Sequence, residues 1–340
     1  MTQHITGVQR YAIEICIILK NLLGEKVIFV APQNILQSQY AKKLDAVCIG
    51  THQGHLWEQI DLPLFLKKRG NPLLLCLCNT APLWYKNKIV TVHDVAYNVF
   101  PQTFNKYFLY AYKFMIPRII QTSKKVITVS EFSKSEISKY YNISPDKIVV
   151  VYNAVSKDFC KKEDKDLQKR KYLLSVSSLN YRKNFKSVLE AFCIFEKTNL
   201  DTDLYIIGDL CNSNFKSIDI EYYHSNPRIK FLGRVSDNEL VRYYSNAVGF
   251  VYPSLYEGFG IPPLEAQACG CAVLAADIPP LHEVLGDSGL YCNPYDVNDI
   301  AKGMRKIIDL PHHCKILGQD NLDRFSWENS AKKIAKACEL

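Results

Sequence analysis

The sequence predicts an α/β protein made of two doubly wound domains that face each other across a cleft. Three observations lead to this fold class. Strand-like apolar runs alternate with helix-like runs along all 340 residues, which favours parallel sheets. A charged stretch at 156–170 separates two such series, as an interdomain linker would. Glycines and charged side chains follow several expected strands, where open α/β sheets bind their ligands.

The first series opens with an amphipathic helix expected at 8–23. A long aromatic helix is expected at 103–121 with a possible break at Pro117, and Pro63 interrupts a mixed segment at 55–69. Ser130 is the expected N-cap of a further helix. The strands of this series are expected at 26–31, 73–78, 88–92, 125–129 and 148–151.

The second series starts at Tyr172, and Asp296 and Asn298 are the candidate caps of its last helix. Its strands are expected at 172–176, 203–207, 229–232, 248–252, 272–276 and 289–292, and its helices near 184–197, 236–246, 261–269 and 296–310. A final helix is expected at 327–339. The expected domains are 1–160 and 171–325, with 326–340 as a C-terminal helix.

The composition is that of a soluble enzyme, with 48% hydrophobic and 22% charged residues. No apolar run approaches the roughly 20 residues of a membrane span, and the N-terminus lacks a signal-peptide pattern. The twelve cysteines are scattered through apolar segments, which indicates a reducing, cytoplasmic compartment. Their Cys-x-Cys spacing does not suit zinc, so no metal is expected.

The positive charge is concentrated in the first half of the chain. Residues 1–165 contain 22 Lys+Arg and 12 Asp+Glu, whereas the remainder contains 20 and 22. Such a basic half suits either a phosphorylated ligand or the anionic inner face of a membrane. A solvated surface without a partner is an equally simple interpretation. The sequence contains no zinc-finger, RRM or arginine-stripe pattern of a nucleic-acid module.

The segment 254–265 is the strongest candidate for an active site. It reads Ser-Leu-Tyr-Glu-Gly-Phe-Gly-Ile-Pro-Pro-Leu-Glu, after a buried strand and before a helix. Gly258 and Gly260 let backbone amides approach a ligand closely, and loop amides together with a helix N-terminus bind anions such as a diphosphate. Glu257 and Glu265 flank this site. The alternative is an ordinary Gly-Pro loop that joins a strand to a helix.

Other candidate residues also follow expected strands. Arg182 and Lys183 precede a helix and suit a diphosphate, although a solvated charged turn is the alternative. His93 ends a strand beside Asp94, and Gly7 lies between a hydroxyl residue and a helix. The alternative for His93 is a purely structural role, and the alternative for Gly7 is a simple helix cap. The segment 201–203, Asp-Thr-Asp, is better explained as a turn than as a metal site.

These motifs, taken in order, resemble the family 4 retaining glycosyltransferases, in particular a mannosyltransferase-like subgroup. The matching segments are 6–11, 92–94, 129–133, 152–155, 182–184, 231–235 and the Glu-x7-Glu motif with its flanks at 252–275. They span nearly the whole chain. The resemblance implies a GT-B fold with two Rossmann-like domains and a last helix that crosses back to the first. It also implies retention of anomeric configuration without a metal or cofactor.

The resemblance implies a role for each candidate residue. Lys183 and Arg182 would hold the donor diphosphate, and Gly7 would lie near the donor phosphates. Glu257 and the amides of 258–260, which include Phe259, would contact the donor sugar, Glu265 the ribose, and His93 the transferred sugar. Leaving-group stabilisation by the cations and amides would drive transfer.

The chain departs from the family pattern at three places. Ser177 replaces a usual glycine, and Tyr181 replaces a usual proline. Family members also have a strand ahead of the glycine loop with which this chain begins. Such a strand is central in its sheet, and without it neighbouring strands would lack a partner. We expect either a start farther upstream or a shortened, less stable domain.

The resulting hypothesis is a hexosyltransferase that uses a nucleotide-sugar, with GDP-mannose as the expected donor. Its acceptor would be a polyprenyl-linked oligosaccharide in the synthesis of O-antigen, capsule or exopolysaccharide, reached from the cytoplasm through a basic surface docked on an anionic membrane. A sugar-nucleotide epimerase and an inactive GT-B paralogue that acts as a partner subunit remain alternatives.

Overall fold

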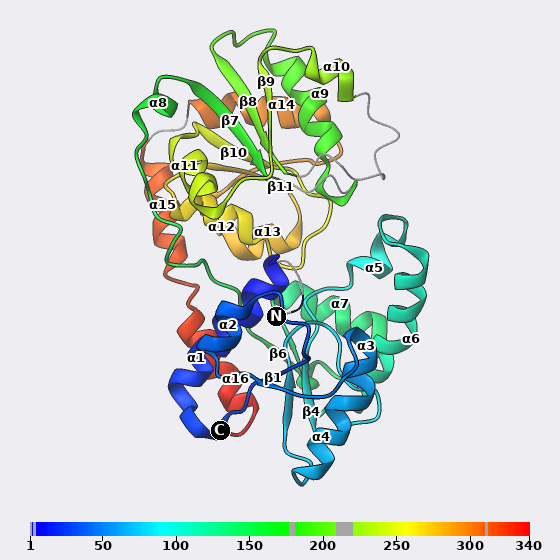
Figure 1. Ribbon diagram of the computed structural model, residues 1–340. Coiled ribbons are helices and arrows are strands. Elements are labelled where there is room, and N and C mark those ends of the chain that lie inside the picture. The colour runs from blue at the N-terminus through cyan, green and yellow to red at the C-terminus, as the bar shows by residue number, and fades with distance from the viewer. Residues whose placement is uncertain (1, 3–4, 177–180, 209–219, 310–311) are drawn as a thin grey trace. The chain divides into compact units, whose positions relative to one another are not determined.

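The structure is a computed structural model that describes residues 2, 5–176, 181–208, 220–309 and 312–340 (Figure 1). The chain divides into two compact units. The first contains Met1–Asn153 together with Ser326–Leu340, and the second contains Ala154–Phe325. Each unit is an α/β structure whose described strands pair only in parallel.

The described strands of the first unit form two sheets. The larger sheet has the order β3-β4-β5-β6, and the smaller one pairs β1 with β2. Among the described residues, β1 and β3 each pair with a strand along one edge only. These strands are β1 Val30–Ala31, β2 Val47–Cys48, β3 Leu74–Cys76, β4 Lys88–Thr91, β5 Lys125–Thr128 and β6 Ile148–Val150.

Helices complete the first unit. The helices of this unit are α1 Gly7–Leu23, α2 Ser38–Lys43, α3 Gly54–Leu56, α4 Leu62–Lys68, α5 Ala96–Val99, α6 Lys106–Thr122, α7 Glu131–Tyr141 and α16 Trp327–Ala337. A π-helical turn at Trp57–Asp61 joins α3 to α4, and short 3-10 turns lie at Gly24–Lys26, Pro101–Thr103 and Pro145–Lys147.

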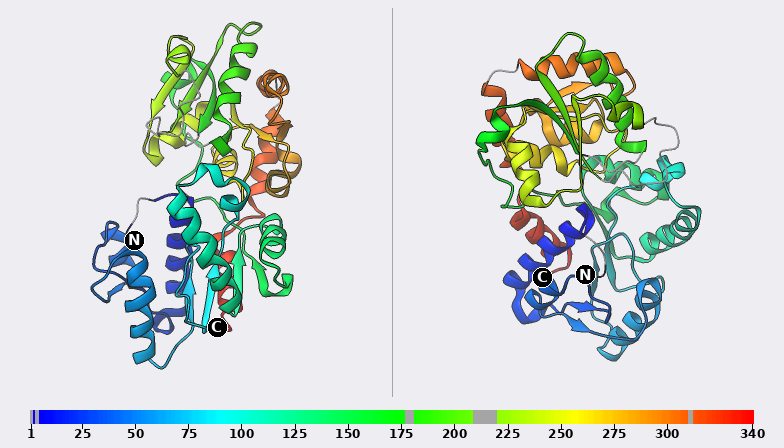
Figure 2. Two further views of the ribbon diagram at one scale, coloured as in Figure 1. Left: turned by 90° about the vertical axis from the view of Figure 1, so that its right-hand side faces the viewer. Right: turned by 45° about the horizontal axis from the view of Figure 1, so that its top comes forward.

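The last helix packs in the first unit, beside α1 (Figures 1 and 2). Ser326 caps α16 by accepting from the Asn329 amide, and the Ser330 hydroxyl donates to the Tyr152 carbonyl at 2.6 Å. The Trp327 ring lies 6.0 Å from that of Tyr11, a fully buried residue of α1. A polar cap and an apolar face therefore fix the chain's return to its first unit.

The second unit contains one six-stranded sheet with the order β12-β11-β10-β7-β8-β9. The chain moves from β7 outward to β9, then returns to the other side of β7 with β10. This reversal makes the β7/β10 pair the topological switch point of the sheet, where open α/β sheets form ligand crevices. The strands are β7 Lys171–Val176, β8 Thr202–Ile207, β9 Ile229–Gly233, β10 Gly249–Tyr252, β11 Val273–Ala276 and β12 Leu290–Cys292.

Helices and short turns complete the second unit. They are α8 Lys165–Gln168, α9 Phe185–Phe195, α10 Ile220–His224, α11 Asp237–Asn246, α12 Ile261–Ala268, α13 Pro279–Leu285, α14 Val297–Ile308 and α15 His312–Leu322, with 3-10 turns at Tyr181–Lys183 (η5) and Gly286–Ser288. Helices α9 and α14 share the apolar core with Leu173 and Leu274. A Cβ on Gly303 of α14 would lie 2.6 Å from Leu274, so only glycine permits this approach.

Most expected elements are present, but three expectations were wrong in detail. Of the strand expected at 26–31, only Val30–Ala31 is a strand in the structure. Helix α6 continues through Pro117 without a break. The stretch 156–170 belongs to the second unit, where the Arg242 Nε donates to Asp164 at 2.8 Å and Asp164 caps α8. Its charges are used in local contacts, and the division between the units falls earlier, at Asn153–Ala154.

Candidate functional site

Two loops meet where the central strands of the second unit end. Strand β7 leads to η5, and β10 leads to the segment 253–260. The Leu255 amide donates to the Arg182 carbonyl at 2.8 Å. In return, the Arg182 guanidinium donates to the Tyr256 carbonyl at 2.7 Å. Backbone and side-chain bonds therefore hold the two loops together at the switch point.

Asn184 fixes the start of helix α9 against the second loop. Its backbone is left-handed, with φ of 56°, a conformation that asparagine tolerates better than most residues. Its side-chain amide donates to the carbonyls of Pro253 at 3.0 Å and Pro294 at 2.6 Å. Because Asn184 directly follows Lys183, these bonds also set the position of the lysine.

The carboxylate of Glu257 lies at the centre of this junction. Its Oε1 accepts hydrogen bonds from Lys183 Nζ at 2.6 Å, Ser254 Oγ at 2.6 Å and Tyr252 Oη at 2.7 Å. Its Oε2 lies 3.3 Å from Arg182 Nη1. The side chains of Arg182 and Lys183 are each 16% exposed and that of Glu257 is 8% exposed. The sequence motifs thus form a buried cluster of two cations and one anion.

The surroundings of Glu257 keep it ionised. Burial alone would raise the pKa of its carboxyl group, but the charges of Lys183 and Arg182 and the hydrogen bonds from Lys183 and Ser254 outweigh burial and lower that pKa to about 2. For Tyr252, burial and the nearby Glu257 charge raise the phenol pKa well above its usual value. Tyr252 therefore remains a neutral donor to the carboxylate.

Helix α12 begins at the end of the second loop. Gly260 is its N-cap with φ of +108°, and a Cβ there would lie 2.6 Å from Leu281. Only glycine fits both constraints. Glu265 lies in α12 and is buried. The ring of Phe259 is also buried and packs edge-on against Phe325, with ring centroids 5.5 Å apart, so this side chain supports the loop.

The remaining predicted residues belong to the first unit. His93 follows β4 and is buried; its Nε2 donates to the Leu77 carbonyl at 3.0 Å, and its backbone amide donates to the Asn79 side chain at 2.9 Å. Burial lowers the pKa of His93 despite the Leu77 carbonyl and Asp94, so the ring is neutral near pH 7. Gly7 is the exposed first residue of α1, directly after its N-cap Thr6.

The structure brings Arg182, Lys183 and Glu257 into direct contact and places Gly258, Phe259, Gly260 and Glu265 along the adjoining loop and helix. Their roles toward a donor, and those of His93 and Gly7, stay predictions. Sequence reasoning assigned no role to Tyr252, Ser254 or Asn184. All three lie within the matching segments 182–184 and 252–275, and for Tyr252 and Ser254 the available signal was a polar residue at the end of a central strand. Ser177 lies outside the described residues.

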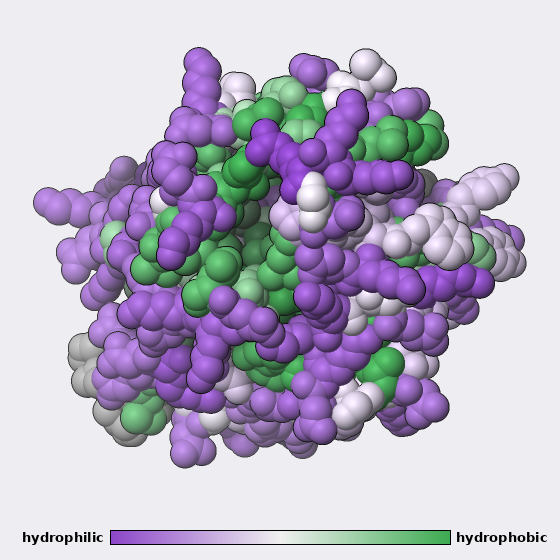
Figure 3. Space-filling view, turned by 90° about the horizontal axis from the view of Figure 1, so that it is seen from below, coloured by the Kyte–Doolittle hydropathy of each residue, from purple (hydrophilic) through white to green (hydrophobic). Residues whose placement is uncertain are grey.

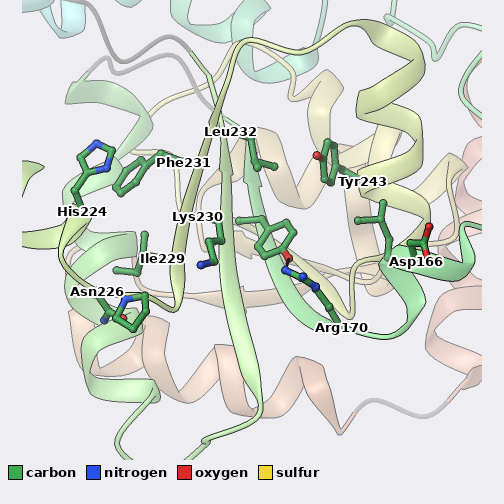
Figure 4. A pocket seen from close by; sticks show the side chains of 12 residues that line it. Asp166, Arg170, His224, Asn226, Ile229, Lys230, Phe231, Leu232 and Tyr243 are labelled. Atoms are coloured by element: carbon green, nitrogen blue, oxygen red, sulfur yellow. Dashed lines mark hydrogen bonds between the residues drawn. The ribbon is translucent and has the colours of Figure 1, made fainter.

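A separate groove of about 620 Å³ lies around β9 in the second unit (Figure 4). Arg170, Lys230 and Tyr243 are among the residues that line it, but none of the cluster around Glu257 does. Arg170 precedes β7 and Lys230 is the second residue of β9, so the groove is not at the carboxyl ends of the strands. It is therefore a weaker candidate for the ligand site.

The two acids of the Asp-Thr-Asp segment pair with cations. Asp201 contacts Lys171 at 2.6 Å, and Asp203 lies 3.7 Å from Arg228, as in a structural turn at the start of β8. In the part of the chain that the structure describes, no group of three or more His, Cys, Asp or Glu side chains is placed to hold a metal ion. Likewise, no described helix is long and apolar enough to cross a membrane.

Comparisons with known proteins agree with the motifs. The family model described as "Glycosyl transferases group 1" matches residues 156–324, and "Glycosyltransferase Family 4" matches residues 5–159. The O-antigen chain mannosyltransferase RfbU of Salmonella typhimurium is 34% identical over 275 residues, which cover 79% of this chain and 74% of that protein. The O-antigen chain mannosyltransferase B of Escherichia coli is 30% identical over 271 residues, which cover 74% of this chain and 70% of that protein.

Solved structures share the fold at low sequence identity. A glycosyltransferase from Rickettsia africae has a TM-score of 0.74 at 20% identity and covers 98% of this chain and 94% of its own. Anabaena Alr3699/HepE in complex with UDP has a TM-score of 0.76 at 16% identity, with 98% and 96% covered. The chain has the GT-B fold of these enzymes. With the family models and the curated relatives, this shows that the protein belongs to the group 1 and family 4 glycosyltransferases.

Proposed function

We propose that this glycosyltransferase moves mannose from GDP-mannose to a lipid-linked saccharide in O-antigen synthesis, with retained anomeric configuration and without a metal. The names of its curated relatives, O-antigen chain mannosyltransferases, support the sugar and the polysaccharide. The main observation that supports a donor site in the second unit is the Arg182–Lys183–Glu257 cluster at the switch point of its sheet. A nucleoside diphosphate bound there would meet two fixed cations and the N-terminus of α12.

The two cations would stabilise the leaving group. As the bond between sugar and diphosphate breaks, negative charge develops on the phosphate oxygens, and Arg182 and Lys183 would neutralise it within a partly buried site. Their positions are set before the donor arrives, because the Arg182 guanidinium donates to the Tyr256 carbonyl and because Asn184, the residue after Lys183, is anchored to the Pro253 carbonyl by its side chain. Little reorganisation would be needed during transfer.

Glu257 would act by position and charge. Its Oε1 already accepts three hydrogen bonds and its Oε2 faces Arg182, and both features weaken a carboxylate as a nucleophile. We assign it to holding the sugar hydroxyls and balancing an oxocarbenium-like sugar, together with the amides of Gly258, Phe259 and Gly260. Glu265 would contact the ribose. The neutral ring of His93 would lie near the transferred sugar, and Gly7 near the phosphates.

The acceptor would be polyprenyl-linked and reached from the cytoplasmic face of a membrane. The first unit carries the charge for this: Met1–Asn153 and Ser326–Leu340 contain 21 Lys+Arg and 11 Asp+Glu, a net charge of +10. A surface with this excess attracts anionic lipids in a salt-dependent manner. The second unit contains 21 Lys+Arg and 23 Asp+Glu and has no such excess of positive charge.

Two assays test the proposal. Thermal shifts across GDP-, UDP- and ADP-sugars should identify a GDP-sugar as the donor, and radiolabelled mannose should pass to a lipid-linked acceptor. Glu257→Ala should abolish transfer. Lys183→Ala should weaken donor binding by about 10–100-fold, because a charge-assisted hydrogen bond contributes about 1.5–3 kcal/mol. Lys186→Ala, an exposed lysine paired with Glu190 at 3.6 Å, is the matched control.

The alternatives give different results. Full activity in both the Glu257 and Lys183 variants would place the site elsewhere. Binding of no nucleotide-sugar at all would favour an inactive paralogue that acts as a partner subunit. Isotope exchange at the sugar in the absence of acceptor would indicate an epimerase.

A further inference from the structure

Helix α6 of the first unit presents large aromatic side chains to solvent. Tyr107 is 86% exposed, Tyr110 72% and Phe114 53%. The exposed residues recur at intervals of three and four, so they lie on one side of the helix. Met115, Ile116, Ile119 and Ile120 are buried and fix the helix to the unit. Helix α6 is therefore apolar on its inner side and aromatic on its outer side.

This arrangement is unusual on the surface of a soluble domain. Scattered exposed apolar residues are ordinary, but a contiguous group marks a binding surface. The face drawn in Figure 3 is mainly polar, with apolar side chains gathered near its centre. Trp84, which is 84% exposed, lies in the segment that touches the end of α6, where the Thr122 hydroxyl approaches the Leu83 carbonyl at 3.4 Å. The aromatic surface is thus accompanied by a second exposed ring near the last turn of the helix.

The charged residues of the chain segment that carries these rings are all positive. Residues 95–130 contain no Asp or Glu but include Lys106, Lys113, Arg118, Lys124 and Lys125. Lys106, Lys113 and Arg118 lie in α6 itself and are exposed. The Arg118 guanidinium lies over the Phe114 ring, 3.7 Å from its centroid. We call six exposed residues of α6, namely Lys106, Tyr107, Tyr110, Lys113, Phe114 and Arg118, the α6 stripe.

We propose that the α6 stripe is the element that docks the protein on an anionic lipid bilayer. Tyrosine and phenylalanine rings partition into the interface between headgroups and acyl chains, while lysine and arginine reach the anionic headgroups. An aromatic stripe with several cations and no acid complements a negative surface and repels a basic one. A second copy of the same stripe would bring like charges together, so the charge pattern favours lipid as the occupant.

This inference rests on the proposed function, because a lipid-linked acceptor requires the enzyme to reach a membrane. It goes further in naming the residues that make the contact. The interaction would lie in the membrane plane without crossing it, as binding by one face of a helix requires. The acceptor would then be delivered by diffusion within the bilayer.

Co-sedimentation of the full chain with vesicles tests the inference. The native protein should bind vesicles of phosphatidylcholine and phosphatidylglycerol, and the bound fraction should fall with added salt. The variant with Tyr107→Ser, Tyr110→Ser and Phe114→Ser should bind at least about tenfold more weakly, since each ring withdraws a large apolar area from water. Its melting temperature should match that of the native protein, because the side chains are exposed.

A charge variant gives an independent measurement. Lys106→Gln with Lys113→Gln should weaken binding to the anionic vesicles by about fivefold per lysine and leave the helix core untouched. The matched control is Lys302→Gln with Lys306→Gln, two exposed lysines of α14 in the second unit. This control should bind vesicles as the native protein does.

The outcomes separate this inference from the proposed function. Native protein that ignores anionic vesicles, or α6 variants that bind as well as the native chain, would overturn the inference. A native dimer that the aromatic variant dissociates, without any vesicle binding, would also overturn it and assign the stripe to a second copy. Failure of every nucleotide-sugar to bind would instead refute the proposed function, and the vesicle measurements would be unaffected by that result.

Discussion

Replacing Glu257 with glutamine should destabilise the second unit by an amount that depends on pH. Glutamine keeps the size of the side chain but removes the charge that Lys183 and Arg182 surround. The pKa of Glu257 falls from 4.5 to about 2 on folding, which corresponds to about 3 kcal/mol of stabilisation. Breaking a buried ion pair by removing one partner costs about 3–5 kcal/mol. Both routes predict a loss of roughly 3–5 kcal/mol at pH 7.

The direction of the pH dependence follows from the lowered pKa. A carboxyl group whose folded pKa lies below its unfolded pKa stabilises the protein fully above the unfolded value, 4.5. This contribution is lost as the pH falls toward about 2. The difference in unfolding free energy between the native protein and Glu257→Gln should therefore be constant from pH 7 to about 5 and shrink at lower pH.

Urea denaturation followed by circular dichroism would measure this difference. The three tryptophans, Trp57, Trp84 and Trp327, all belong to the first unit, so tryptophan fluorescence would not follow the second. The control is Glu190→Gln, which removes an exposed pair with Lys186 and should cost about 0.5 kcal/mol or less. A loss below about 1 kcal/mol for Glu257→Gln, or one that stays the same at pH 3, would refute this account of the cluster.

Two further predictions concern the glycine loop and the buried histidine. Gly260→Ala should lower the stability of the second unit by about 1–3 kcal/mol, because it adds backbone strain and a clash with Leu281. A fall in melting temperature would measure this loss. The control is Gly24→Ala, which should cost less because Gly24 has a positive φ but open space around it. Because burial lowers the pKa of His93, the unfolded chain takes up a proton at a higher pH than the folded chain does. The unfolding free energy of the native protein should therefore decline as the pH falls below about 6.5. The variant His93→Gln should lack this decline. A native stability that is flat between pH 7 and 5.5 would contradict this reasoning.

Local sequence patterns predicted the second unit well, because its central strands are continuous apolar runs. Strands β7 and β10 lie where those runs predicted them. The rule that ligands gather at the carboxyl ends of parallel strands then linked Arg182 and Lys183 with the Glu257 loop, although 74 residues separate Lys183 from Glu257. What the rule could not supply was the pairing itself. Strand patterns do not encode which side chains contact the Glu257 carboxylate.

The errors arose where tertiary contacts decide local structure. Strand β1 is short because its partner β2 offers only Val47–Cys48 for pairing, and strand length depends on the neighbour as much as on apolar content. The stretch 156–170 has the composition of a linker, yet Lys162 and Asp164 donate their amides to Ser245 and Asn246 of α11. Charged residues look solvated in a sequence until their partners, distant in the chain, are known.

The chemistry of the cluster explains why a glutamate occupies the centre of the proposed anion site. Arg182 and Lys183 are partly buried like charges, and without a counterion their repulsion and desolvation would push them apart or into water. Glu257 supplies that counterion and accepts from both, so it holds the two cations together at the place where we propose that a diphosphate binds. A donor can then compete for the same nitrogens, because its two phosphate groups offer more charge than one carboxylate. In the proposed complex, binding of the donor would thus replace Glu257 at these nitrogens with the diphosphate and free Glu257 to contact the sugar before transfer begins.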